Sequence, residues 1–237
     1  MAVLDSKMST APDPLGRKNL AAEIIRINKD NPEAGLIAYA AQQLQQGEVL
    51  GMPTDTFYGL AADPFNLRAV ERVYDIKSRS RHKPLSLLIE SVEQADALSN
   101  YLSPEFYLLA EHFWPGPLTL IVPATPKLPL KVTANSGNVA LRVPAAPIPL
   151  AVIRKAGMPI TATSANLSGA SECTSAAAVR DQLAGRLNLI VDGGPSPHEV
   201  PSTIVDLTVD EIGKPSWRIQ REGAIPAQEI TALLSGK

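Results

Sequence analysis

Residues 53–60 read Pro-Thr-Asp-Thr-Phe-Tyr-Gly-Leu, and residues 77–85 read Lys-Ser-Arg-Ser-Arg-His-Lys-Pro-Leu. The first stretch follows an apolar run that is typical of a buried strand, and Pro53, which has no backbone N–H, ends the strand ladder. Gly59 then permits a sharp change of backbone direction. The stretch therefore predicts a turn that presents two threonine hydroxyls and one carboxylate at a strand end, a place suited to small polar ligands.

A helix is predicted between these two stretches. Val70, Val73, Tyr74 and Lys77 occur at positions i, i+3, i+4 and i+7, the spacing of one face of an amphipathic helix. Lys77 would leave the end of a helix whose apolar face packs on the core. We expect this helix to bring the cations of residues 77–83 back toward the polar turn.

Each stretch alone has a simpler interpretation. The Pro-Thr-Asp-Thr sequence at 53–56 is compatible with an ordinary hydrogen-bonded turn. Lysine and arginine at a helix C-terminus can also act by complementing the helix dipole. A third segment at 161–169, Thr-Ala-Thr-Ser-Ala-Asn-Leu-Ser-Gly, favours a binding site, because it adds a Ser-x-Asn pair at the end of another predicted strand.

With these three segments in this order, the chain resembles the YrdC-like family of threonylcarbamoyl-AMP synthases. The family carries a Pro-Thr-(Asp/Glu)-Thr-x-Tyr-Gly-Leu turn, a Lys-x-Arg pair and a Ser-x-Asn pair. The sequence Trp-Pro-Gly-Pro-Leu-Thr at 114–119 also resembles a family segment. The resemblance runs from about Leu36 to Pro226 and lacks the extra C-terminal domain of longer members, so it indicates the single-domain type.

Alternating strand and helix signals predict one α/β domain. The expected elements include a short helix at Leu20–Ile27 and a strand at Ile160–Thr163, and short hairpin-like spacings elsewhere make some strand pairs antiparallel. The resemblance implies a twisted mixed parallel and antiparallel sheet, flanked by helices, around a deep cationic cleft. We expect residues 1–35 to form a partly flexible N-terminal extension, 36–226 the YrdC-like catalytic domain, and 227–237 a C-terminal helix and tail.

Composition limits the classes of function. Of the 237 residues, 22 are basic and 24 acidic, and the resulting net charge of −2 argues against a general nucleic-acid binder with a broad cationic face. The single cysteine, Cys173, excludes an intramolecular disulfide and fits a reducing compartment. The chain has no apolar leader and no apolar run of about eighteen residues, so we expect a soluble, cytoplasmic protein without membrane contact.

The resemblance also implies a reaction. L-threonine, bicarbonate and ATP are condensed into threonylcarbamoyl-AMP and pyrophosphate, and the product is the donor for a modified adenosine beside the tRNA anticodon. A carbamate formed from threonine and bicarbonate is itself the nucleophile toward the α-phosphate, so the protein must supply positioning and charge neutralisation. The sequence contains neither a nucleophile elbow nor a P-loop, and we expect scattered cations and hydroxyls to bind ATP.

The site residues follow from the resemblance and from side-chain chemistry, with Arg79 best suited to a bidentate grip on phosphate oxygens. The expected catalytic residues are Lys77, Arg79, Ser164 and Asn166, the expected threonine contacts are Thr56, Arg142, Ala162 and Ser202, and the expected nucleotide contacts are Arg79, Lys83, Ser164 and Arg221. Two alternatives stay open: Arg142 forms a buried ion pair with an acid such as Asp206, or Ser202 merely begins a strand.

Two residues depart from the family pattern. Leu88 stands where some relatives have a histidine that touches threonine, and Glu172 stands where they have a serine near the nucleotide.

The three histidines share no ligand spacing, so no resident metal is expected, and Mg²⁺ is expected to arrive with ATP. The expected partners are the downstream proteins that transfer the threonylcarbamoyl group to tRNA, with at most weak contact to tRNA itself.

Two other functions stay open. The cations of residues 77–83 are compatible with an RNA-binding or ribosome-assembly module. Aromatic residues make up only 5% of the chain, however, and none lies between these cations, so no stacking platform is predicted. A carbamoyl-phosphate-using relative, like the related domain of hydrogenase-maturation proteins, would keep the ATP chemistry. Dependence on threonine separates these possibilities.

Overall fold

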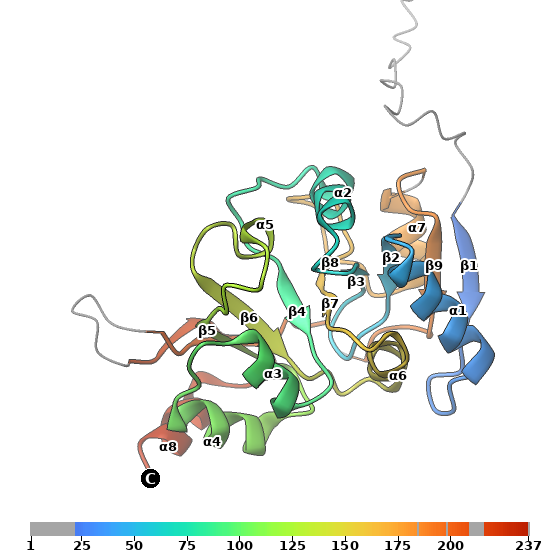
Figure 1. Cartoon of the computed structure of the whole chain (residues 1–237). Coiled ribbons are helices and arrows are strands. Elements are labelled where there is room, and N and C mark those ends of the chain that lie inside the picture. The colour runs from blue at the N-terminus through green and yellow to red at the C-terminus, as the bar shows by residue number, and fades with distance from the viewer. Residues whose placement is uncertain (1–21, 184, 198, 209–215, 237) are drawn as a thin grey trace, which may run out of the picture.

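The computed structural model describes residues 22–183, 185–197, 199–208 and 216–236, and its strands form two mixed sheets (Figure 1). In spatial order, the five-stranded sheet contains β1 (Glu23–Arg26), β9 (Leu189–Asp192), β2 (Leu50–Met52), β3 (Gly59–Ala61) and β8 (Thr163–Ser164). The six-stranded sheet contains β11 (Arg218–Arg221), β10 (Thr203–Asp206), β5 (Leu118–Pro123), β6 (Asn138–Arg142), β4 (Ser86–Leu88) and β7 (Ile160–Thr161). The α/β class and the mixed pairing are confirmed, but the strands are divided between two sheets.

Helices flank both sheets (Figure 1). They are α1 (Ala34–Gln45), α2 (Leu67–Lys77), α3 (Val92–Leu98), α4 (Pro104–Phe113), α5 (Leu130–Thr133), α6 (Pro147–Ala156), α7 (Ala176–Leu183) and α8 (Ala227–Leu234). Helices α1 and α6 pack on each other and share an apolar cluster with β2 and β9 (Figure 1). Helices α4 and α8 pack together beside the six-stranded sheet. No helix in the described ranges is both long and apolar enough to cross a membrane.

Helix α2 has the position and the buried face that the sequence predicts. The side chain of Asn66 caps its first turn by accepting from the backbone N–H groups of Arg68 (3.1 Å) and Ala69 (3.3 Å). Val70 and Val73 are fully buried in the larger apolar cluster. The helix ends at Ser78, which has a left-handed conformation with φ of 50°. The cations therefore begin where the chain turns away from the helix axis.

The segment 160–164 passes from one sheet to the other. Its first part, β7, pairs with β4, and its second part, β8, pairs with β3. The hydroxyl of Thr161 donates to the carbonyl of Leu60 in the five-stranded sheet (2.9 Å), and the N–H of Ala162 donates to the carbonyl of Ser86 (2.9 Å). The single strand predicted here is therefore split, because its backbone groups are bonded to both sheets.

The helix predicted at Leu20–Ile27 is wrong, because the described part of this segment contains strand β1. Ile25 and Ile27 are buried whereas Ile24 is exposed, which is the two-residue period of a strand. The strand pairs in parallel with β9, more than 160 residues away in the chain. It lies within the segment that we expect to be an N-terminal extension, and residues 1–21 of that segment lie outside the described residues.

The chain after β11 folds back on the start of β10 around the buried Thr203. The Thr203 hydroxyl donates to the carbonyl of Ile225 (2.6 Å) and accepts from the N–H groups of Gly223 and Ile225 (3.0 Å each). A Cβ atom on Gly223 would lie 2.2 Å from the carbonyl oxygen of Pro201 and 2.6 Å from the carbonyl carbon of Ser202. Glycine is therefore required here by the close approach of two backbone segments.

Replacement Gly223→Ala should destabilise the fold by about 1–3 kcal/mol, the usual cost of overpacking, because the obstacle is backbone that cannot rotate away. Gly35→Ala, in the first turn of α1, is the matched control, since its Cβ would meet no atom within 4 Å. It should leave the free energy of unfolding unchanged or raise it by up to about 1 kcal/mol. Urea unfolding of both variants checks this, and equal stabilities would contradict the packing argument.

Candidate functional site

A cavity of about 280 Å³ lies where the two sheets meet, and we name it the inter-sheet cavity. Both sheets contribute to its wall, through β3 and β8 on one side and β5, β6 and β10 on the other. The predicted site residues that line it are Thr56, Arg79, Arg142, Ala162, Ser164, Ser202 and Arg221. Lys77, Lys83 and Asn166 are not among the lining residues.

The turn between β2 and β3 contributes a pair of threonine hydroxyls. Thr54 donates its single hydroxyl proton to the carbonyl of Phe57 (2.7 Å) and accepts from the N–H of Thr56 (3.0 Å). The hydroxyl of Thr56 lies 3.2 Å from that of Thr54 and accepts a hydrogen bond from Arg142 Nη1 (2.9 Å). Thr56 Oγ1 is therefore held at the cavity wall with its proton directed either to Thr54 or to a ligand.

Arg142 reaches the cavity from β6 but is already extensively bonded. Its Nε donates to the carbonyl of Gly116 (2.9 Å), its Nη1 to Thr56, and its Nη2 lies 2.6 Å from Asp55 Oδ1. The Nη2 contact lacks hydrogen-bond geometry, so the Asp55 carboxylate acts mainly through its charge. The buried ion pair considered from the sequence thus exists, but its partner is Asp55. Asp206 was the wrong candidate, since it pairs with Arg218 (2.9 Å).

Ser202 and Arg221 form a second polar group on the opposite wall. The guanidinium of Arg221 donates to the carbonyl of Ser202 through Nε (3.1 Å) and Nη2 (2.8 Å), and Nη2 also reaches Ser202 Oγ (3.1 Å). Ser202 Oγ is 2.8 Å from Thr119 Oγ1. Burial lowers the pKa of Arg221, and the nearby Glu172 carboxylate opposes this shift. A predicted threonine contact and a predicted nucleotide contact therefore touch each other.

Lys77 lies behind the cavity wall, with only 2% of its surface exposed. Its ammonium donates to the carbonyl of Ser164, to the carbonyl of Asn166 (2.9 Å) and to Asn166 Oδ1 (2.9 Å). Asn166 Oδ1 also accepts from Ser164 Oγ (2.7 Å), and Asn166 Nδ2 donates to the carbonyl of Ala170 (2.6 Å). The three N–H groups of the ammonium match three oxygens, so Lys77 and Asn166 fix the Ser164 turn from inside.

Burial and, to a smaller extent, the positive charge of Arg79 lower the pKa of Lys77 to about 8, while Glu172 and Cys173 oppose the shift. Lys77 is therefore mostly protonated at neutral pH despite its burial. The charge is satisfied by carbonyl and amide oxygens, none of which cancels it. The cavity consequently keeps a full positive charge directly behind one wall.

Arg79 and Lys83 differ in what they offer to the site. Arg79 is half-buried, lines the cavity and donates from Nη2 to the carbonyl of Pro84 (3.1 Å), with Nε 3.5 Å from the carbonyl of Lys83. Burial lowers the pKa of Arg79. The side chain of Lys83 is exposed, and it is the backbone carbonyl of this residue that faces Arg79.

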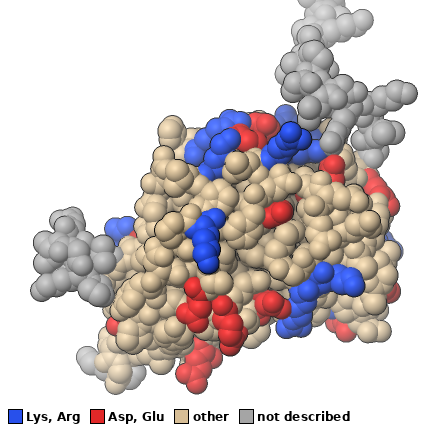
Figure 2. Space-filling view, in the orientation of Figure 1, with Lys and Arg blue, Asp and Glu red and all other residues tan. Residues whose placement is uncertain are grey.

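Charge in the wall of the inter-sheet cavity is unevenly distributed. Among its described lining residues, three carry guanidinium groups and Glu172 is the one acid. By contrast, the face in Figure 2 carries mixed charges over α2 and a group of acidic side chains over α3 and α4, without a continuous basic surface. Within the wall of the cavity, positive charge therefore outweighs negative charge. The described residues contain no group of three or more His, Cys, Asp and Glu side chains that could hold a metal ion.

Several cavity residues were not predicted as site residues. Thr54 belongs to the motif itself, and Thr119 follows the Trp-Pro-Gly-Pro segment, so both had a sequence signal. Leu88 and Glu172, which depart from the family pattern, also line the cavity. Tyr58 lines it as well; its hydroxyl donates to the carbonyl of Gly194 (2.7 Å), and burial raises its pKa to about 12.

The sequence matches one family of known proteins over most of its length. The Sua5/YciO/YrdC family model, described as "Telomere recombination", matches residues 42–223. A threonylcarbamoyl-AMP synthase of Bacillus subtilis (strain 168) is 41% identical over 199 residues, which cover 84% of this chain and 56% of that protein. A threonylcarbamoyl-AMP synthase of Pyrococcus abyssi is 36% identical over 208 residues, which cover 87% of this chain and 59% of that protein. The resemblance predicted from the motifs is confirmed.

A solved structure agrees with the fold. The crystal structure of P. abyssi Sua5 complexed with L-threonine is similar with a TM-score of 0.85 and 36% identity, and the match covers 90% of this chain and 61% of that chain. The chain therefore spans less than two thirds of the length of these relatives.

The first test of the site concerns the pH dependence of stability at Lys77. The pKa of this lysine is about 8 in the folded chain against an ordinary value of 10.5, so the unfolded chain binds more protons between these two pH values. The stability contribution of Lys77 should therefore rise as pH increases from about 8 to 10.5 and be lost as pH falls through 8. Urea unfolding of wild type and Lys77→Met across this window should show a growing difference.

Lys155→Met is the control for this test, because Lys155 is an exposed lysine at the end of α6. Its difference from wild type should stay constant over the same range. Lys77→Met should also lower stability at neutral pH by about 1–3 kcal/mol, since the turn oxygens lose their donor. A constant difference for both variants would contradict the buried ammonium.

Proposed function

The chain belongs to the Sua5/YciO/YrdC family, and on this premise we propose that it condenses L-threonine, bicarbonate and ATP into threonylcarbamoyl-AMP and pyrophosphate. The product would serve the threonylcarbamoyladenosine modification of tRNA. The observation that carries the proposal is the inter-sheet cavity, in which a threonine-hydroxyl turn and guanidinium groups of opposite walls face one space. Such a cavity suits a small amino acid beside an anionic nucleotide.

The proposed reaction has two steps. The amine of threonine and bicarbonate form a carbamate with loss of water, and a carbamate oxygen attacks the α-phosphorus of ATP. The bond from the α-phosphorus to the bridging oxygen breaks, and pyrophosphate leaves. The protein contributes no covalent nucleophile; it holds the reactants in line and offsets the charge that develops on the phosphate oxygens.

We assign the threonine side of the cavity to Thr56, Arg142, Ala162 and Ser202, and the nucleotide side to Arg79, Ser164 and Arg221. Arg142 has already committed three nitrogens to Gly116, Thr56 and Asp55, so its role in holding a substrate carboxylate must use its remaining N–H groups. Lys77 and Asn166 support Ser164 from behind the wall. Lys83 acts through long-range charge, because its side chain is exposed and outside the lining.

Mg²⁺ is expected to enter as part of the ATP substrate, held mainly by its phosphates. Glu172 is the described carboxylate that lines the same cavity. We expect the reaction to take place in the cytoplasm, where the unstable product is passed to the proteins that transfer the threonylcarbamoyl group to tRNA.

The two competing functions have weaker support. An RNA-binding module would need an exposed cationic surface, whereas Arg79 and Arg221 line a cavity and the face in Figure 2 carries mixed charge. A carbamoyl-phosphate-using enzyme has less support because the relatives at 36% and 41% identity are named threonylcarbamoyl-AMP synthases. Threonine dependence therefore remains the decisive measurement.

Pyrophosphate release from ATP should require threonine and bicarbonate together, because the nucleophile must be assembled from both. A coupled pyrophosphate assay on the purified chain, with either component omitted, provides the check. Discrimination between threonine and serine should be modest at the binding level, since one methyl group in a pocket is worth about 1–3 kcal/mol. Equal turnover without threonine would favour one of the other functions.

Replacement Arg79→Lys should lower turnover on the order of a hundredfold or more, the size expected when a transition-state donor is lost, because an ammonium keeps the charge but lacks the planar two-donor fork. Arg154→Lys is the matched control, since Arg154 is 63% exposed and forms a 3.6 Å ion pair with Glu90 away from the cavity. Thermal midpoints should change little in either variant. Wild-type activity for Arg79→Lys would assign this arginine to the helix end alone.

A further inference from the structure

The guanidinium of Arg79 is positioned by backbone carbonyls of its own loop, residues 78–84. These are the carbonyls of Pro84 and Lys83, which lie 3.1 Å from Nη2 and 3.5 Å from Nε. No carboxylate lies within ion-pair distance of Arg79 among the described residues. The location of this cation in the cavity therefore depends on what fixes those two carbonyls.

Tyr74 contacts one of these carbonyls from inside the protein. Its side chain is 2% exposed and packs in the larger apolar cluster. Its hydroxyl lies 3.0 Å from the carbonyl of Lys83 and 2.9 Å from the carbonyl of Lys131 on α5. A phenol has a single proton to donate, so this one group is shared between the cation loop and α5. The carbonyl of Lys83 is thus an acceptor common to Tyr74 and Arg79.

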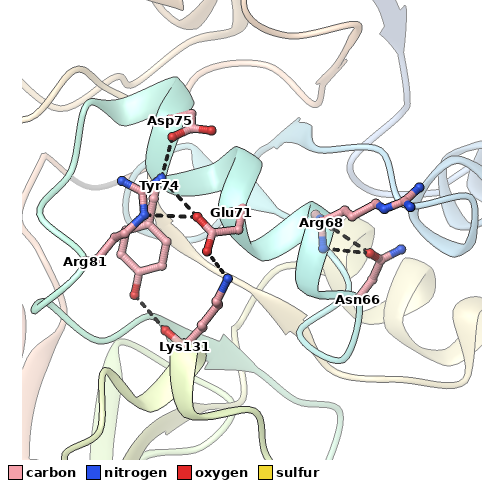
Figure 3. A network of polar contacts seen from close by, with 8 residues as sticks. Asn66, Arg68, Glu71, Tyr74, Asp75, Arg81 and Lys131 are labelled. Atoms are coloured by element: carbon pink, nitrogen blue, oxygen red, sulfur yellow. Dashed lines mark hydrogen bonds and ion pairs between the residues drawn. The ribbon is translucent and has the colours of Figure 1, made fainter. Parts of the chain in front are cut away.

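Ion pairs cross the same junction at the surface (Figure 3). Arg81 reaches Asp75 (2.8 Å) and Glu71 (3.0 Å), and Lys131 pairs with the same Glu71. The side chains of Arg81 and Lys131 are 58% and 52% exposed, so solvent and salt weaken these contacts. The Tyr74 hydroxyl is shielded from both. Together with the backbone hydrogen bond from the N–H of Leu85 to the carbonyl of Val132 (2.9 Å), it holds the loop against α5 independently of salt.

We propose that Tyr74 is a positioning residue for Arg79: its hydroxyl fixes the carbonyl of Lys83 and thereby the guanidinium that binds phosphate oxygens in the cavity. The proposal rests on the anion-binding role that the proposed function gives to Arg79. Phenylalanine at position 74 would keep the packing of the ring and remove only the hydroxyl. Tyr74→Phe therefore separates positioning from core packing.

The test measures binding of magnesium pyrophosphate by calorimetry to wild type, Tyr74→Phe, Arg79→Ala and the double variant. Tyr74→Phe should weaken binding about tenfold, the effect of one misplaced charged hydrogen bond. In the Arg79→Ala background, Tyr74→Phe should have no further effect, because the group it positions is gone. Additive losses in the double variant, or unchanged affinity in Tyr74→Phe, would overturn the proposal.

Tyr107→Phe is the chemically matched control, since it removes a hydroxyl that bonds Asp96 (3.2 Å) on a different part of the surface. It should leave pyrophosphate affinity unchanged. Steady-state kinetics give a second readout: Tyr74→Phe should raise KM for ATP or lower kcat, with KM for threonine unchanged. Equal rises in both KM values would indicate a general structural defect.

The binding measurement also distinguishes this proposal from the proposed function. Calorimetry uses the resting protein and needs no turnover. If wild type binds pyrophosphate but releases none from ATP with threonine and bicarbonate, the reaction is wrong while the Tyr74 comparison still decides its role. Failure of wild type to bind pyrophosphate would overturn the role of Arg79 and with it that of Tyr74.

Discussion

The buried ammonium of Lys77 is the interaction on which the site depends. It extends from the last residue of α2 into the turn at Ser164 and Asn166, where three oxygens accept its three N–H groups. That turn directly follows the segment that passes between the two sheets. One cation therefore joins a helix end, the crossing between the sheets and a wall of the cavity, and a buried charge held in this way tolerates few other arrangements.

The positive charge of the cavity is explained by the uncharged hydrogen-bond partners of its cations. Lys77 is satisfied by carbonyl and amide oxygens, and Arg79 and Arg221 by carbonyls and a hydroxyl, so these cations keep their charge. Arg142 differs, because Asp55 lies against it. The cavity is therefore positive where a polyanion is expected and nearly neutral where an amino acid is expected, a division that suits two reactants of different charge.

Much of this arrangement could be predicted from local sequence. The helix ending at Lys77 and the polar turn follow from spacing, whereas the grouping of Arg79, Ser164 and Arg221 follows from the family resemblance. Strand β1 and the division of residues 160–164 could not be predicted, because both depend on partners far away in the chain. The partner of Arg142 could not be predicted either, because the distance from Asp55 to Arg142 is set by how the two sheets meet.

The Lys-x-Arg pair shows why a motif names residues without giving their roles. Ser78, between the two cations, has a left-handed conformation, and its N–H donates to the carbonyl of Asp75 (3.1 Å). The left-handed conformation reverses the chain at the end of α2. Lys77 is consequently directed into the protein and Arg79 toward the cavity. Arg186 secures the reversal by donating to the carbonyl of Ile76 (2.9 Å) and to Ser78 Oγ (3.3 Å). Two neighbouring cations with similar charge thus have different surroundings, one bonded inside the protein and one lining the cavity, because a single residue between them changes the direction of the backbone.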